Sequence, residues 1–212
     1  MKKAYAYKKI GDVFQILEDG QHLKTPKGAD VNTDDEKLAK ILIDELKEGK
    51  SYGSASSILS YHYTYCEIVQ KQSWSIEDLR KSLMNEFDLI NDDFLMFRQT
   101  SAVKAAIASA MEDELVQLFE KCTIRQLVAI LVLASPYCSI MLPAYLIWDI
   151  VNPLTENKDD CNCSDLLQQF IFDIKHYFIE LEDGEGDDNE EELDEWLKRL
   201  RTAIEMFIIY FG

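Results

Sequence analysis

The sequence predicts an α+β protein in which a small β-rich N-terminal unit precedes a mainly α-helical bundle. Within residues 1–30, β-forming side chains surround an Asp-Gly dipeptide, which is typical of a hairpin turn. From Ser54 onward, apolar residues recur at the spacing of helices. We therefore expect a β-rich domain with one helix over residues 1–52 and an α-helical domain over residues 53–212.

The N-terminal strands are expected to flank Asp19-Gly20, because glycine readily takes the positive dihedral angles of a two-residue turn. Pro26 then ends the strand pair, since proline has no N–H to donate to a ladder. The expected strands are residues 13–17, residues 21–24 and, as a third, residues 5–10.

Three helix starts carry a capping box, in which a Ser or Thr and a polar residue three positions later bond each other's free N–H groups. The pairs are Thr33 with Glu36, Ser75 with Asp78, and Thr123 with Gln126. Gly49 is expected to end the first helix in the left-handed conformation. Apolar stripes predict further helices over residues 58–69, 76–87, 103–118, 166–178 and 193–211.

A charge-free segment over residues 126–148 is long enough to cross a bilayer. Pro136 and Pro143 interrupt it, and no basic cluster flanks it, so a buried pair of helices is favoured. Pro136 is expected to kink or break its helix. Residues 152–164 are polar and contain Pro153, which predicts a loop.

The net charge of −17 disfavours nucleic acid and anionic membranes as partners and suits a basic protein. Ten acidic residues and no basic residue lie within residues 181–195, which predicts an acidic loop before the last helix. The five cysteines are odd in number and three lie in apolar helical stretches, so free thiols in a reducing, cytoplasmic compartment are expected.

No catalytic motif is visible. His22, His62 and His176 fall on unrelated elements, and glycine patterns that hold phosphate are absent from the sequence. Cys161 and Cys163 have no second pair with which to bind zinc. The loop that starts at residue 183 lacks the glycine and the glutamate of a calcium loop. We expect no enzymatic activity, no metal and no cofactor. A deep cleft that holds two or more ionisable side chains with shifted pKa values would support the alternative hypothesis of an enzyme.

Residues 16–28, with the sequence ILEDGQHLKTPKG, and the following Leu38-Ala39 resemble the opening of the ATP-synthase alpha-subunit assembly chaperones. Members of that family have a strand ending in Leu-Asp-Gly-Arg, then Leu-Lys-Thr-Pro and a glycine, then a helix. Gln21 stands here in place of the arginine. The resemblance implies a β-rich part before a helical part with a charge-poor helix, for which residues 103–151 are the counterpart.

The same resemblance implies a non-enzymatic chaperone that shields an apolar interface of the alpha subunit before assembly. Lys24 and Thr25 are expected to be exposed, with Leu23 in the core. Apolar client-binding stretches are expected around Tyr137 and Trp148 and on the outer face of the last helix. The candidate binding residues in the motif are Asp19, Gly20, Lys24, Thr25 and Pro26.

A second hypothesis is an acidic regulatory or inhibitor-type module that binds its partner through residues 182–195. Glu190 and Glu191 would then carry the contact. Salt separates the two hypotheses, because screening weakens a charge contact more than an apolar one.

Overall fold

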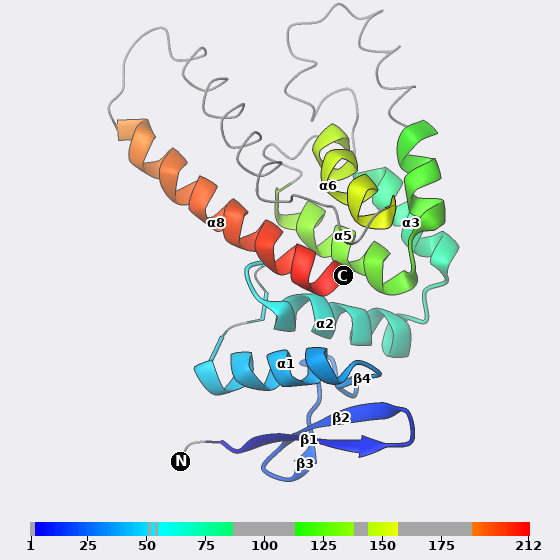
Figure 1. The fold of residues 1–212 in the computed structure, drawn as a ribbon, viewed down its shortest axis with the longest axis vertical. Coiled ribbons are helices and arrows are strands. Elements are labelled where there is room, and N and C mark those ends of the chain that lie inside the picture. Colours follow the sequence, from blue (N-terminus) through cyan, green and yellow to red (C-terminus); the bar gives the residue numbers. More distant parts are fainter. Residues whose placement is uncertain (1–2, 51, 54, 87–112, 138–143, 157–187) are drawn as a thin grey trace, which may run out of the picture.

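The computed structural model describes residues 3–50, 52–53, 55–86, 113–137, 144–156 and 188–212, and the structural statements below concern these residues. A small antiparallel sheet lies at one end of the molecule, as Figure 1 shows, and the helices are stacked on it. Helix α1 lies between the sheet and helix α2, and helices α5 and α8 pack on α2. The predicted α+β class is confirmed.

The sheet is built around its second strand, which pairs with the first on one edge and with the two short strands on the other. Asp19 and Gly20 form the two-residue turn between the second and third strands, with φ angles of 51° and 80°. The predicted turn is therefore confirmed. The strands are β1 (Tyr5–Ile10), β2 (Val13–Glu18), β3 (Gln21–His22) and β4 (Asn32–Thr33).

Helix α1 (Glu36–Glu48) begins two residues later than the predicted capping box implies. Its N-cap is Asp35, whose carboxylate accepts hydrogen bonds from the N–H groups of Lys37 and Leu38 at 2.8 and 3.2 Å. Thr33 lies on β4 and is buried, and its hydroxyl accepts the N–H of Asp35 instead. The prediction of Thr33 as the N-cap was therefore wrong, because Thr33 is held in β4 by pairing with β2.

The end of α1 caps the next helix. Gly49 ends α1 at φ 74°, as predicted. Glu45, near that end, is only 4 % exposed. One of its carboxylate oxygens accepts the Ser57 hydroxyl and the Leu59 N–H, both at 2.9 Å, at the start of α2 (Ile58–Glu67). A buried carboxylate at a helix N-terminus satisfies free N–H groups, so Glu45 ties the two helices together.

A π-helical turn, η1 (Ile68–Gln72), continues α2 and ends at Ser73, which has φ 54°. Val69 lies in this wider turn and is 40 % exposed, so the predicted apolar face stops at Ile68. Helix α3 (Ile76–Glu86) follows, with the predicted reciprocal bonds between Ser75 and Asp78.

Helices α5 (Ile124–Tyr137) and α6 (Ala144–Glu156) cover the ends of the charge-free segment. The capping box predicted at Thr123 is confirmed, since its N–H donates to Gln126 Oε1 at 2.9 Å. Pro136 lies in the last turn of α5, which ends one residue later. About half of the described side chains of the two helices are buried and the others are half-buried, with none fully exposed, which agrees with the predicted buried pair. None of the helices in the described part of the chain combines the length and the apolar character that a membrane span requires.

Two predicted loops are helical in their described parts. Residues 152–156 belong to α6, which includes Pro153, because Val151 and Leu154 on either side of the proline are buried and hold the final turn in place. Residues 188–195 belong to α8 (Asp188–Phe211) rather than to an acidic loop. Residues 157–164 and 182–187 lie outside the described part of the chain.

The buried apolar side chains form one continuous cluster from the sheet to the C-terminal helix, across the boundary predicted at residue 52. Helix α8 packs on α2 and α5 and buries the stripe predicted for the last helix. Residues 113–121 are helical, three residues beyond the end predicted at residue 118, whereas residues 103–112 and 166–178 lie outside the described residues. The buried stripe residues of α8 are Leu200, Ala203, Ile204, Phe207 and Phe211, and Tyr210, which lies outside the predicted stripe, is buried with them.

Candidate functional site

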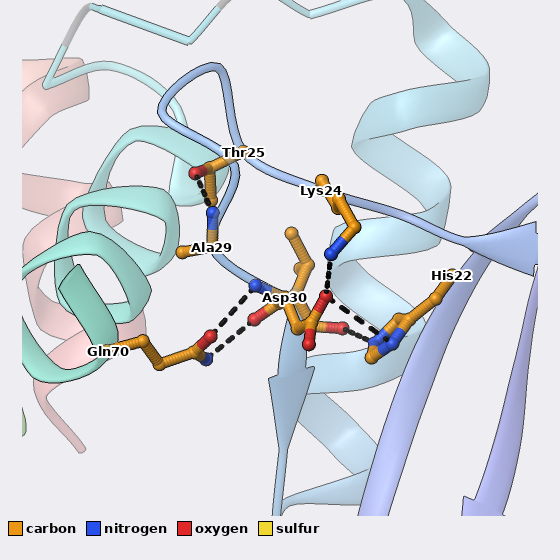
Figure 2. Close-up of polar contacts among 7 residues, drawn as sticks. His22, Lys24, Thr25, Ala29, Asp30 and Gln70 are labelled. Carbon is orange, nitrogen blue, oxygen red and sulfur yellow. Dashed lines mark hydrogen bonds and ion pairs between the residues drawn. The ribbon is translucent and has the colours of Figure 1, made fainter.

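The Leu-Lys-Thr-Pro run enters a tight loop between β3 and β4, here called the 24–30 loop. Thr25 closes it, because its N–H donates to the Ala29 carbonyl at 2.8 Å and its hydroxyl accepts the Ala29 N–H at 3.1 Å. Figure 2 shows this bond beside the contacts of Lys24 and Gln70. Thr25 is only 4 % exposed, so its predicted exposure was wrong. A hydroxyl that closes its own loop turns away from solvent.

The 24–30 loop is held by Gln70 of η1 and by an ion pair between its own two ends. Gln70 of η1 accepts the Asp30 N–H and donates to the Asp30 carbonyl, each at 2.8 Å (Figure 2). Lys24 is exposed, as expected, and its ammonium lies 2.6 Å from the Asp30 carboxylate. That hydrogen bond lowers the pKa of Asp30. The predicted strand over residues 21–24 therefore stops at His22, and Lys24 makes an isolated bridge to Asp30.

Pro26 and Lys27 form the tip of the loop, which contacts the end of α2. The Lys27 N–H donates to Glu67 Oε1 at 3.2 Å, and its ammonium lies 3.2 Å from Glu67 Oε2. The Glu67 side chain is 12 % exposed, whereas that of Lys27 is 66 % exposed. The carboxylate is therefore fixed against the protein, and the lysine reaches it from solvent.

A pocket of about 460 Å³ opens beside this tip. The rings of Tyr52 and Tyr63 face it with their centroids 5.7 Å apart. Burial raises the pKa of Tyr63 to about 12, so its phenol is neutral at physiological pH. The other described residues that line the pocket include Pro26, Lys27, Ser60, Thr64, Glu67, Trp74, Ser82, Leu131 and Val132. The pocket thus combines aromatic and aliphatic walls with one carboxylate among the described lining residues.

His62 occupies a different, closed position where β4, α2 and α8 meet. Its Nε2 lies 2.9 Å from the Asn32 carbonyl, and its Nδ1 lies 3.2 Å from the Tyr210 hydroxyl. A carbonyl only accepts, so Nε2 carries the proton and Nδ1 accepts the tyrosine hydroxyl. Burial lowers the pKa of His62 to about 4. Both ring nitrogens are therefore used in holding elements together.

Two described cysteines are free and buried. The Cys66 sulfur lies 3.6 Å from His62 Nε2, and burial raises the pKa of this thiol to about 11. Burial also raises the pKa of Cys122 to about 11. Thiols that stay protonated at neutral pH are poor nucleophiles. The pairing of Cys66 with His62 is thus a packing contact.

The remaining predicted site residues are dispersed. Asp19 and Gly20 form an exposed turn, where Asp19 accepts the Ala4 N–H, and they do not line the pocket. Trp148 is half-buried and packs against the core. The side chains of Tyr137, Glu190 and Glu191 lie outside the described residues, although their backbones are helical.

Sequence reasoning missed Tyr52, Tyr63, Glu67 and Trp74 as site residues. Tyr52 and Trp74 stand in short segments that flank α2, and only the folded chain brings them to the Lys27 tip. The Cys161 and Cys163 pair lies outside the described residues. Among the residues that the structure describes, no three His, Cys, Asp or Glu side chains form a metal-binding group.

No family model, curated protein or solved structure matches this chain.

Proposed function

We propose that the chain is a non-enzymatic protein-binding factor that serves as an assembly chaperone for the ATP-synthase alpha subunit. The observation that carries the proposal is the pocket beside Pro26 and Lys27. These two residues belong to the segment on which the resemblance to the chaperone family rests.

The chemistry of the pocket supports protein recognition. Tyrosine and tryptophan are enriched at the energetically dominant positions of protein interfaces, where they anchor in or around pockets. Tyr52 lines the pocket and is 54 % exposed, so part of its ring is available to a partner. The 24–30 loop is fixed by Gln70, which lowers the entropy lost on binding.

The state of His62, Cys66 and Cys122 supports binding rather than catalysis. His62 is neutral and uses both nitrogens, and Cys66 and Cys122 are buried thiols with raised pKa values. Free buried thiols also suit a reducing compartment, and we place the protein in the cytoplasm on that ground.

The direct test is binding to the purified alpha subunit of the same organism, together with suppression of its aggregation measured by light scattering. Tyr52→Ala should weaken binding by about tenfold, the effect typical of a tyrosine near the centre of an interface. Val116→Ala is the matched control, since Val116 is 41 % exposed and does not line the pocket; it should leave the Kd within about twofold. Absence of binding by the unaltered chain would overturn the proposal.

The salt dependence of binding distinguishes this function from that of an acidic regulatory module. Burial of apolar surface in the pocket tolerates salt, so binding should persist when NaCl rises from about 0.05 to about 0.5 M. A partner held through Glu190 and Glu191 would dissociate over that range. It would also be lost in the double variant Glu190→Gln, Glu191→Gln, which the pocket account predicts to bind normally.

A further inference from the structure

We propose that the pocket receives an arginine side chain of the partner, with the guanidinium against Glu67 and the aromatic rings. The inference deepens the proposed function and rests on it for the protein nature of the ligand. Three features of the pocket carry it: aromatic walls, a fixed carboxylate, and a cation of the chain itself that already reaches that carboxylate.

The walls suit a cation. Tyr52, Tyr63 and Trp74 all line the pocket, and the two tyrosine rings lie 5.7 Å apart with an interplanar angle of 39°. The faces of such rings attract cations electrostatically, most strongly for tryptophan. A planar, weakly hydrated guanidinium stacks on these faces better than an ammonium does. The aromatic walls therefore favour arginine over lysine.

The carboxylate supplies the opposite charge. Glu67 is the acidic side chain among the described residues of the pocket lining. Its Oε1 accepts the Lys27 N–H, which fixes the carboxylate at the end of α2. A guanidinium bonds a fixed carboxylate through two parallel N–H groups when both oxygens are accessible, and through one when they are not. Either arrangement neutralises a charge that is 12 % exposed.

Lys27 shows that a cation fits this position. Its ammonium lies 3.2 Å from Glu67 Oε2, and the side chain is 66 % exposed. An ion pair with so exposed a lysine contributes little stability, so an incoming guanidinium can displace it. Lys27 is then an internal competitor of the ligand. Because the Glu67 side chain is only 12 % exposed, salt screens an ion pair with its carboxylate much less than a contact through surface carboxylates.

The test uses N-acetyl-arginine amide as the probe and the uncharged isostere N-acetyl-citrulline amide as its control. Binding is followed by the indole N–H signal of Trp74 in the ¹H–¹⁵N spectrum of the full chain, assigned with Trp74→Phe. The chain has three tryptophans, so the other two signals are internal references. We expect a saturable shift of the Trp74 signal with the arginine compound and a Kd at least about fivefold weaker for citrulline. Equal binding of the two compounds, or no shift, would overturn the proposal.

Two variants should change the Kd for the arginine compound in opposite directions. Glu67→Gln keeps an acceptor for the Lys27 N–H but loses the charge, so the Kd for the arginine compound should rise about tenfold. Lys27→Ala removes the competitor and should lower the Kd by about threefold. Unchanged or weaker arginine binding in Lys27→Ala would contradict the displacement step, because a purely structural lysine does not oppose the ligand.

The arginine site and the proposed chaperone function can be refuted independently of each other. Alpha-subunit binding that is equal for the unaltered chain and Glu67→Gln, with no Trp74 response to the arginine compound, overturns the pocket inference and leaves the chaperone function standing. A normal Trp74 response without any binding of the alpha subunit overturns the chaperone function and leaves the arginine site standing.

Discussion

Acidification should weaken the fold through His62, which hydrogen-bonds β4 of the β-rich part and α8 of the helical part. Burial lowers its pKa to about 4 in the folded chain, whereas a free histidine has a pKa near 6.5. Coulombic interaction with Arg125 also lowers this pKa, while the Asn32 carbonyl and the charge of Asp34 act to raise it. The net direction is set by burial, the largest of these causes.

The direction in which the free energy of unfolding changes with pH depends on whether the folded or the unfolded chain binds the proton at the higher pH. Between pH 6.5 and 4 the unfolded chain takes up a proton that the folded chain excludes, so the free energy of unfolding falls as the pH falls. The stabilisation is complete above pH 6.5 and is lost over that window. At about 1.4 kcal/mol per pKa unit, the whole effect is roughly 3 kcal/mol, of which about 2 kcal/mol is lost between pH 7.5 and 5.

Urea unfolding of the unaltered chain and of His62→Gln at pH 7.5, 6.5, 5.5 and 5.0 isolates this effect. Glutamine has both a donor and an acceptor for the Asn32 carbonyl and the Tyr210 hydroxyl that His62 contacts, and it does not titrate in this range. The difference in unfolding free energy between the two proteins should shrink by about 2 kcal/mol across the series. Parallel curves would refute the reasoning, since they would mean that His62 titrates alike in the folded and unfolded chains.

Three further substitutions test individual contacts. Glu45→Ala should lower the free energy of unfolding by about 2–4 kcal/mol, because it removes the cap of α2 and leaves buried donors unpaired, while Glu45→Gln should lower it by about half as much. Gly20→Val should cost about 1–2 kcal/mol at its φ of 80°, against about 0.5 kcal/mol or less for Asp19→Asn. Gln70→Ala should speed amide hydrogen exchange in the 24–30 loop about tenfold, with little change in global stability.

Each of these three predictions would be contradicted by a specific result. Equal stability of Glu45→Ala and Glu45→Gln would mean that the carboxylate oxygens do not cap α2. Tolerance of valine at Gly20 would exclude the left-handed turn. Unaltered exchange in Gln70→Ala would show that the loop is held by its own bonds through Thr25 rather than by η1.

Local signals predicted the elements that depend on local contacts. The Asp19-Gly20 turn and the Ser75 and Thr123 caps involve atoms within four residues of each other, so the sequence contains the whole interaction. The first helix shows the limit of this reasoning. Asp35 competes with Thr33 for the cap, and the pairing of β4 with β2 decides between them.

Tertiary packing overrode propensity in the C-terminal half. A proline and neighbouring polar residues predicted a loop from residue 152, but buried Val151 and Leu154 keep α6 helical around Pro153. The first turns of α8 are acidic and were predicted to belong to an acidic loop. Acidic side chains at a helix N-terminus are favourable to the helix dipole, which agrees with a start at Asp188.

The pocket was the least predictable feature. Lys27 and Glu67 are separated by 40 positions, Trp74 lies in the segment between η1 and α3, and Leu131 lies on α5. The sequence indicated Pro26 through a motif but carried no periodic signal for its neighbours. Such a site follows only from the way the 24–30 loop docks on α2 and η1.

Site-specific photo-cross-linking tests the central claim of client binding most directly. Tyr52 is replaced by p-benzoylphenylalanine in the full chain inside the native cell, with Val116, 41 % exposed and away from the pocket lining, replaced in the control. We predict that irradiation attaches the ATP-synthase alpha subunit to position 52 and not to position 116. Equal attachment at both positions, or none of the alpha subunit at position 52, would contradict the account.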